Sequence, residues 1–319
     1  MNTAPAQRFP PQLVLLLGIF AVASASILIR FAQREAASLV IAAFRMGISG
    51  LILLPFAVPR HNEEFRRLSH REFGLAVLSG FFLAVHFATW ILSLEYTSVA
   101  SSVVLVTTNP LWVALLAPIF LKERLTAAIL LGLLVAMGGG VVVAMSDSCV
   151  RSASGFDCPP LAKFVQGEAF FGNLLALIGA WTGAGYILIG RSLRQKLSLT
   201  AYIFLVYGVA GSILVGMVVA SGLEVIGFSP PIYLYLLLLA LLPQLLGHSS
   251  FNWALAHLPA SYVSIALLGE PISSTILAYF LLGEVPGNLK ILGAWLILAG
   301  ILVATYKPVR KSTPVYNKD

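Results

Sequence analysis

The chain has 319 residues, of which 59% are hydrophobic and only 10% are charged. A soluble domain carries roughly 25% charged residues, so this sequence holds too little charge to cover a water-facing surface. Its long unbroken apolar runs favour membrane-spanning helices over barrel strands, which would alternate apolar and polar residues. The composition therefore predicts an all-α integral membrane protein whose surroundings are the lipid bilayer.

Ten apolar segments each supply the roughly 20 residues that a helix needs to cross a bilayer. The third and fourth run together through residues 95–98, and the eighth and ninth through residues 257–259, so each pair requires a tight turn. The first segment loosely resembles a signal peptide, but it has a partner later in the chain and is expected to be retained. The predicted spans are Pro11–Ile29, Ser38–Val58, Phe73–Leu94, Val99–Leu121, Ala127–Met145, Ala169–Gly190, Thr200–Ala220, Ile232–Ala256, Ala260–Leu282 and Leu289–Tyr306.

Lys and Arg are unevenly distributed between the two sides of the membrane in this topology. Fourteen lie in the N-terminal segment, alternate loops and the C-terminal tail, and five lie in the other loops. Short cytoplasmic loops collect these cations, so both termini are predicted to be cytoplasmic. The same solvated loops account for the net charge of +7 without a nucleic-acid partner.

The two cysteines, Cys149 and Cys158, both fall in the loop of residues 146–168, which this topology places outside. An oxidising exterior permits a disulfide, which would close that loop. Two free thiols fit the sequence equally well, so the choice between them stays open.

The chain repeats itself at an offset of 161 residues, nearly without gaps. The matching pairs include glycine, proline and charged residues: Gly47 and Gly208, Gly50 and Gly211, Pro110 and Pro271, Glu123 and Glu284, Arg30 and Arg191, Gly139 and Gly300. Each copy holds five predicted helices, an odd number, so the second copy enters the membrane from the opposite side. Inverted repeats are typical of transporters, in which two similar halves exchange conformations around a central site. An old duplication without exchange, as in some channels, is the alternative.

This repeat divides the chain into four parts. The first five-helix unit occupies residues 1–145, and an extracytoplasmic loop follows in residues 146–168. The second, inverted unit occupies residues 169–306, and a cytoplasmic tail occupies residues 307–319.

Several motifs carry a family resemblance. The first copy contains Asn109-Pro110-Leu111-Trp112, then Leu121-Lys122-Glu123-Arg124-Leu125-Thr126, and then a helix with Gly132 and Gly138-Gly139-Gly140. This pattern resembles the signature of EamA-type proteins of the drug/metabolite transporter superfamily. The second copy repeats it as Glu270-Pro271, Leu282-Gly283-Glu284, Gly293 and Gly300, but has Val285-Pro286 where the first has Arg124-Leu125.

The resemblance covers almost the whole chain and omits only the tails and the loop of residues 146–168. It implies ten helices around a central cavity and export or exchange of small metabolites, often amino acids. A bacterial inner (plasma) membrane is the location that the resemblance implies. It fixes neither the substrate nor the oligomeric state, because its motifs are mostly structural.

Glu270 is the strongest candidate for a functional side chain. It lies ten residues into the ninth predicted span, near mid-bilayer. Ionisable residues at such depth usually face a cavity or a partner, and burial favours the neutral, protonated carboxyl group. We expect Glu270 to bind a proton or a substrate ammonium group; the alternative is a carboxyl group that only bonds a neighbouring helix.

Asn109 is the repeat partner of Glu270, and each of the two residues precedes a proline. Pro110 and Pro271 are expected to kink their helices, because each removes a helical hydrogen bond and crowds the carbonyl four residues back. Those carbonyls, at Val106 and Leu267, are candidates for substrate hydrogen bonds, although a simple kink is the favoured interpretation.

Two predicted spans that are repeat partners each carry a polar and aromatic face. The third span places His86 and Trp90 one turn apart, and the eighth places Gln244, His248, Phe251 and Asn252 at similar spacing. One such histidine alone would be read as a packing residue. Two such faces in equivalent helices indicate cavity lining.

Trp181 and Tyr186, in the sixth predicted span, are candidates for an aromatic wall of the cavity, although ordinary helix packing explains them as well. Aromatic rings suit flat or cationic solutes. Arg45, in the second span, resembles the family's arginine at that position. It is interpreted as structural and is expected either to reach outward to the interface or to pair with a carboxylate.

The chain lacks a P-loop motif, a His/Cys cluster with metal-ligand spacing and a recognisable catalytic set, so no cofactor, metal or enzymatic activity is expected. The sequence predicts a secondary transporter that exports small metabolites such as amino acids by alternating access, with proton coupling through Glu270 as a further hypothesis. A lipid flippase or channel of the same fold is one alternative. A membrane-embedded enzyme acting on lipid-linked substrates is the other.

Overall fold

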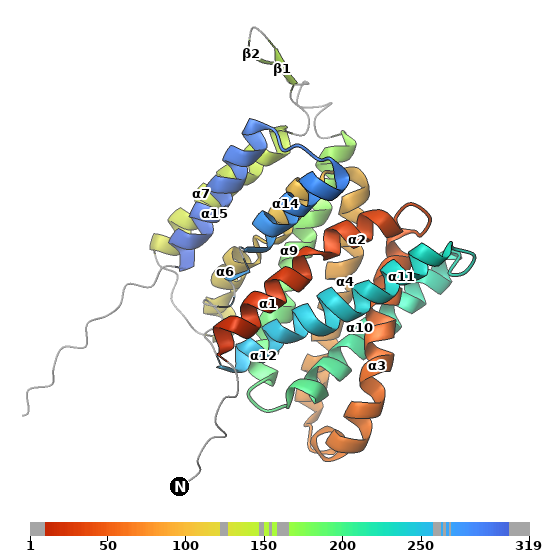
Figure 1. The fold of residues 1–319 in the computed structure, drawn as a ribbon. Coiled ribbons are helices and arrows are strands. Elements are labelled where there is room, and N and C mark those ends of the chain that lie inside the picture. The colour runs from red at the N-terminus through yellow and green to blue at the C-terminus, as the bar shows by residue number, and fades with distance from the viewer. Residues whose placement is uncertain are drawn as a thin grey trace, which may run out of the picture.

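The computed structural model describes residues 10–121, 127–146, 150–152, 155–157, 166–257, 263, 266–267 and 269–305. The described chain is a bundle of helices with a short two-stranded hairpin at one end (Figure 1). The elements are α1 (Pro11–Ala23), α2 (Ala25–Ala32), α3 (Ser38–Arg66), α4 (His70–Tyr96), α5 (Val99–Val106), α6 (Asn109–Leu121), α7 (Ala127–Ser146), β1 (Val150–Ser152), β2 (Gly155–Asp157), α9 (Glu168–Leu193), α10 (Leu199–Ser221), α11 (Pro230–Leu239), η1 (Ala240–His248), α12 (Ser249–His257), α14 (Gly269–Leu282) and α15 (Asn288–Thr305).

Helices occupy the described part of every predicted span. Six helical stretches are long and apolar enough to cross a membrane, and Val99–Val113, Leu130–Val143 and Asn288–Gly300 are shorter apolar helices. The outward-facing side chains include exposed large apolar residues such as Phe20 and Trp295, which suit a lipid environment. The chain is a multi-pass membrane protein, and ten crossings stay a prediction.

Three predicted spans are interrupted rather than continuous. The first bends at Ser24, whose hydroxyl donates to the Ala21 carbonyl at 2.7 Å. The fourth breaks at Thr107 and Thr108, directly before α6. The eighth passes through the π-helix η1, which contains Pro243; π-turns are rare and often occur at functional sites.

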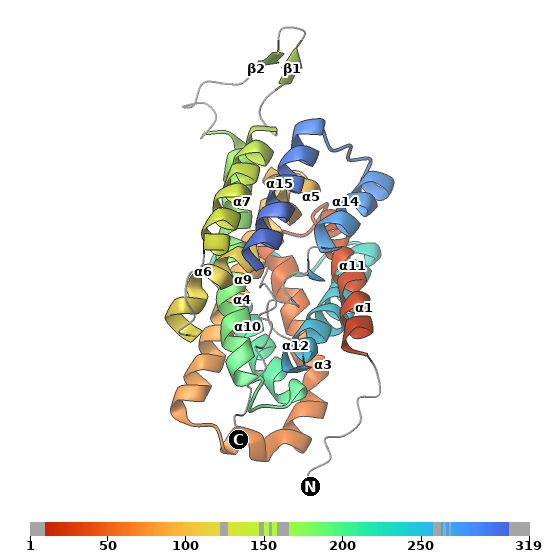
Figure 2. The same ribbon diagram turned by 90° about the vertical axis from the view of Figure 1, so that its left-hand side faces the viewer.

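Helices at matching positions of the two predicted units pack against each other. α3 contacts α10, and α7 lies beside α15 in both views (Figures 1 and 2). The third span of the first unit (α4) contacts the first span of the second unit (α9). In the same way, the third span of the second unit (η1 and α12) contacts the first span of the first unit (α1). These contacts fit two similar halves related by a two-fold axis.

Glycines that match at the 161-residue offset make the α3–α10 contact crosswise. A Cβ added at Gly50 would lie 3.6 Å from the Cα of Gly208, and one added at Gly211 would lie 3.2 Å from the nitrogen of Gly47. Small residues let helix backbones approach closely inside a membrane. The paired glycines therefore explain why the backbones of these two helices can approach closely.

The loops gather at two opposite ends of the bundle. At one end Lys196 pairs with Glu72 at 2.5 Å, which joins the loop after α9 to the start of α4. At the other end Arg30 lies 3.5 Å from Glu284, and Glu35 accepts hydrogen bonds from Ser229. Figure 1 shows the loop after α3 near the lower end and the turn between α14 and α15 near the upper end. This alternation agrees with the predicted loop order, and the side that is cytoplasmic stays a prediction.

The loop between α7 and α9 departs from the all-helical prediction. β1 and β2 pair antiparallel there, with Val150 opposite Asp157. Cys149, Cys158 and Glu123 lie outside the described residues, so the choice between a disulfide and two free thiols is not tested by the structure.

Candidate functional site

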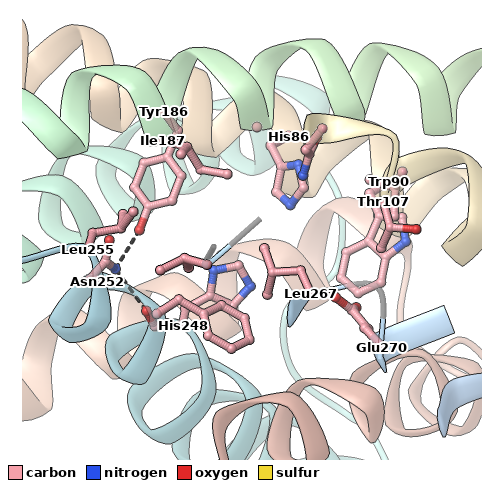
Figure 3. Close-up of a pocket in the computed structure, with 15 residues that line it drawn as sticks. His86, Trp90, Thr107, Tyr186, Ile187, His248, Asn252, Leu255, Leu267 and Glu270 are labelled. Atoms are coloured by element: carbon pink, nitrogen blue, oxygen red, sulfur yellow. Dashed lines mark hydrogen bonds between the residues drawn. The ribbon is translucent and has the colours of Figure 1, made fainter. Parts of the chain in front are cut away.

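A buried cavity lies between the two predicted units (Figure 3). Its volume is about 60 Å³, counted over the positions open to the centre of a water molecule. One water needs about 10–15 Å³ on that measure, so the space suits roughly four to six waters or a small solute. The lining residues are His86, Trp90, Val106, Thr107, Asn109, Gly183, Tyr186, Ile187, His248, Phe251, Asn252, Leu255, Val263, Leu267 and Glu270.

Eight of the nine residues predicted to bind substrate line this cavity: His86, Trp90, Asn109, Tyr186, His248, Phe251, Asn252 and Glu270. Trp181 is the exception, and its prediction is corrected. Its side chain is 43% exposed and packs edge-on against Trp112, with ring centroids 5.2 Å apart. Trp181 precedes Gly183 by two residues, which places the two about 200° apart around α9.

Sequence reasoning missed Gly183 and Ile187 among the lining residues. Gly183 stands three residues before Tyr186 on α9 and four residues before Ile187, so it shares a helix face with each of them. Helical spacing from Tyr186 would have identified Gly183, and spacing from Gly183 would then have identified Ile187. Together with Leu255, they give the cavity an apolar wall beside its polar groups.

Two histidines face each other across the cavity (Figure 3). The ring centroids of His86 and His248 are 6.5 Å apart. Nδ1 of His86 lies 2.8 Å from the Gly179 carbonyl oxygen, which only accepts, so this nitrogen carries the proton. The Nε2 atom of a neutral His86 is then an acceptor available to a solute.

A hydrogen-bonded group forms the opposite wall of the cavity. The Asn252 amide nitrogen donates to the Tyr186 hydroxyl at 2.6 Å and to the His248 carbonyl at 2.9 Å (Figure 3). It also reaches the buried Tyr207 hydroxyl at 3.4 Å. These bonds tie α9, α10 and α12 together and hold the Tyr186 ring against the cavity.

Glu270 lies in the first turn of α14 and is 8% exposed. No other described residue forms a hydrogen bond or ion pair with its carboxyl group. The described chain therefore does not show the bond to a neighbouring helix that a purely structural role would require. The partial positive charge at a helix N-terminus favours an anion at this position. The carboxyl group is therefore positioned to interact with a cavity solute.

The prolines open helices instead of kinking continuous ones. Pro110 is the second residue of α6 and Pro271 the third of α14, early positions where a missing N–H costs little. The Leu267 carbonyl accepts from the Glu270 N–H at 2.9 Å. The Val106 carbonyl accepts from the Asn109 side-chain nitrogen at 3.1 Å when the Asn109 amide is placed in the orientation that satisfies its hydrogen bonds. Both carbonyls thus have a donor within the protein, which agrees with the favoured interpretation that they are not substrate ligands.

Arg45 neither reaches the interface nor pairs with a carboxylate, contrary to both expectations for it. Its side chain is fully buried, and its Nε atom donates to the Gln244 Oε1 atom at 2.9 Å. The guanidinium carbon lies 4.1 Å from the centre of the Phe87 ring. Phe87 and Gln244 thus hold Arg45 inside the bundle, close to the cavity.

The described residues contain no group of three or more His, Cys, Asp or Glu side chains that could hold a metal ion. The chemistry of the cavity is that of binding: a carboxyl group, two imidazoles, amides and aromatic rings in an apolar shell.

The profile of the EamA-like transporter family matches residues 10–145 and again residues 170–306. The chain belongs to the EamA-like transporter family. The two matches fall on the two halves that line the cavity, and each half alone carries only part of the lining. This EamA-family protein is a membrane transporter.

Curated proteins similar to this EamA-family chain are also transporters. It is 24% identical over 238 residues to an uncharacterized transporter of Archaeoglobus fulgidus, covering 73% of this chain and 76% of the relative. It is 25% identical over 274 residues to an uncharacterized transporter of Bacillus subtilis, covering 83% of each chain. It is 27% identical over 199 residues to a probable terminal-alkyne amino-acid exporter of Streptantibioticus cattleyicolor, covering 62% of this chain and 61% of the exporter.

A crystal structure shares the fold of this EamA-family chain. The two superpose with a TM-score of 0.63 at 17% sequence identity, covering 92% of this chain and 96% of the other. This likeness extends over nearly the whole chain and shows a shared fold.

Proposed function

We propose that this EamA-family transporter is a secondary carrier that exports small amphipathic metabolites, amino acids first among them, by alternating access. The observation that carries the proposal is the buried cavity lined by both halves, with Glu270 at its edge. A site shared by two inverted halves can open to either side when the halves exchange conformations. The amino-acid exporter among the relatives adds support for the solute class.

The contacts at the end predicted to be outer suit a closed gate. Arg30 of the first half lies 3.5 Å from Glu284 of the second, and Glu284 also accepts from the Val99 N–H at 2.9 Å. Lys290 donates to the Ser98 hydroxyl at 2.8 Å. Export requires these contacts between halves to break, because they close the path between the cavity and the outside.

Glu270 is proposed to couple solute movement to protons. A buried carboxylate needs a compensating positive charge, and either a proton or a solute ammonium group supplies it. If the two compete for Glu270, an amine leaving the cell is exchanged for an entering proton. The rings of Trp90 and Phe251 line the same cavity and favour a cationic group.

The location proposed is the plasma membrane, with both termini in the cytoplasm. The Lys and Arg distribution supports this orientation. Reporter fusions after residues 146–168 and at the C-terminus would test it, because the two positions should give opposite activities in an intact cell.

Counterflow in proteoliposomes tests the carrier mechanism. Vesicles loaded with unlabelled L-alanine or L-leucine should accumulate the labelled amino acid transiently and saturably, and Glu270→Gln should reduce the rate at least tenfold. Glu35→Gln is the matched control, because Glu35 is a carboxyl group at the surface, away from the cavity. Flux that rises linearly with concentration, or lipid scrambling without counterflow, would favour a channel or flippase instead.

A further inference from the structure

Arg45 leaves strong hydrogen-bond donors without partners in the membrane interior. Its Nη1 and Nη2 atoms are buried and have no hydrogen-bond partner among the described residues. The Nε2 atom of Gln244, whose Oε1 atom holds Arg45, is also buried and unpartnered. Three donor atoms on two contacting side chains therefore lie unused at one place.

Such a group is costly unless something binds it. A buried charge without a directly bound counter-charge is strongly destabilising, and each unmet buried donor adds to that cost. No carboxylate oxygen of the described chain lies within 4.0 Å of the Arg45 guanidinium, the distance limit for an ion pair. The four ion pairs found among the described residues involve other side chains. The planar guanidinium fork matches the two oxygens of a carboxylate, which makes a carboxylate the best-fitting missing partner.

The unused donors adjoin the cavity. The guanidinium carbon of Arg45 lies 5.8 Å from the centre of the Trp90 ring, and Trp90 lines the cavity. The Phe87 ring, on which Arg45 stacks, lies 5.3 Å from the ring of His248, another lining residue. The π-helix η1 supplies both Gln244 and His248, so one unusual turn connects the donor group to the cavity wall.

Glu270 supplies the opposite charge on the same cavity. Arg45 and Glu270 are near enough to interact electrostatically, yet no ion pair within 4.0 Å joins them. A solute with a carboxylate at one end and an ammonium group close to it could satisfy both side chains at once. An amine or a monocarboxylate could satisfy only one.

We propose that the Arg45 guanidinium and the Gln244 amide bind the carboxylate of the transported solute, while Glu270 binds its ammonium group. The solute class is then the zwitterionic α-amino acids. Arg45 and Gln244 do not themselves line the cavity, so the proposal includes a movement of the Trp90 side chain, which lies near Arg45 and lines the cavity. This inference rests on the proposed transport function and names the chemistry that its site recognises.

Thermal stabilisation of the purified protein by matched probes tests the proposal. The probes are L-alanine, L-valine and L-leucine, their amino alcohols, which lack the carboxylate, and the corresponding carboxylic acids, which lack the amine. A ligand that binds the native state raises its apparent stability by mass action. We expect the wild type to bind at least one amino acid about tenfold or more tightly than its amino alcohol.

Variants separate binding from folding. Arg45→Gln should bind the amino acid and the amino alcohol equally, and Arg45→Lys should lose most of the preference because a lysine lacks the fork. Arg67→Gln is the matched control, since Arg67 is an exposed arginine with an ordinary surface pair. Glu270→Gln should instead lose the preference for the amino acid over the carboxylic acid that lacks the amine.

Several outcomes would overturn the proposal. Equal binding of the amino acid and its alcohol by the wild type would do so even if every variant failed to fold. So would stabilisation by none of the probes, or an Arg45→Gln protein that is less stable but keeps the wild-type preference. Counterflow distinguishes failure of this proposal from failure of the proposed function. Saturable exchange without a preference for the carboxylate would rule out the Arg45 site but would still support a carrier.

Discussion

Arg30 and Glu284 lie 254 positions apart in the sequence, yet their side chains meet at 3.5 Å. Arg30 also donates to the Thr97 carbonyl at 2.9 Å. The pair joins the first half of the chain to the second at the end away from the loop after α3. Its side chains are 28% and 25% exposed, so water partly screens the attraction between the two charges and the pair can break and re-form.

Weakening this pair should favour the state that opens at that end. Glu284→Gln removes the charge but keeps the shape. A partly exposed ion pair contributes about 1 kcal/mol, which corresponds to roughly a five-fold shift in the equilibrium. The measurement is labelling of a cysteine introduced at Leu255 in the cavity by an impermeant thiol reagent applied from outside. The double variant with the charges exchanged, Arg30→Glu with Glu284→Arg, should restore part of the wild-type labelling rate. Unchanged labelling in Glu284→Gln would contradict a gating role for the pair.

Loss of the carboxyl group at Glu270 should remove the pH dependence of transport as well as most of its rate. If Glu270 alternates between a proton and an ammonium group, wild-type efflux depends on the pH gradient. Glu270→Gln has no proton to exchange, so its residual rate should be the same with and without a gradient. Proteoliposome efflux with an imposed gradient measures this, and a Glu270→Gln protein that still responds to the gradient would place the coupling elsewhere.

Helix packing between α7 and α15 should depend on one glycine and not on its neighbour. A Cβ added at Gly139 would lie 2.7 Å from the Gly293 carbonyl oxygen, whereas one added at Gly138 meets nothing within 4 Å. Gly139→Val should therefore lower stability by about 1–3 kcal/mol, as overpacking does. Gly138→Val is the matched control and should melt like the wild type in detergent; equal losses in both variants would contradict this contact.

The Glu35 carboxylate should stabilise its contact with Ser229 in a pH-dependent way. The Ser229 hydroxyl and N–H donate to it at 2.6 and 2.7 Å, and these bonds hold the pKa of Glu35 below its ordinary value of 4.5. A lowered folded-state pKa means that this stabilisation is present above pH 4.5 and is lost as pH falls through the folded pKa. Thermal melts between about pH 3 and pH 7 should show this acid loss in the wild type and less of it in Ser229→Ala.

The topology can be tested with the two native cysteines. Cys149 and Cys158 lie in the loop predicted to be outside. After mild reduction, an impermeant maleimide should label both in intact cells, and the label should disappear in a double serine variant. Protection in intact cells with labelling after lysis would reverse the orientation.

The sequence by itself determined the large-scale organisation, because composition and periodicity report burial in lipid directly. The 161-residue offset also located the glycines that cross between α3 and α10, and the polar faces identified His86, Asn252 and most of the cavity. Its error at Trp181 arose because an aromatic residue on a membrane helix faces lipid or a neighbour as readily as a cavity.

Only the tertiary structure decided what the buried charges contact. Arg45 and Gln244 are 199 positions apart, and nothing in their local sequence shows that one holds the other. The π-helix that carries Gln244, Pro243 and the cavity residue His248 was likewise not indicated by the sequence pattern. Partners that lie far apart in sequence, and the geometry between them, follow from how the two halves meet, which hydropathy and spacing do not encode.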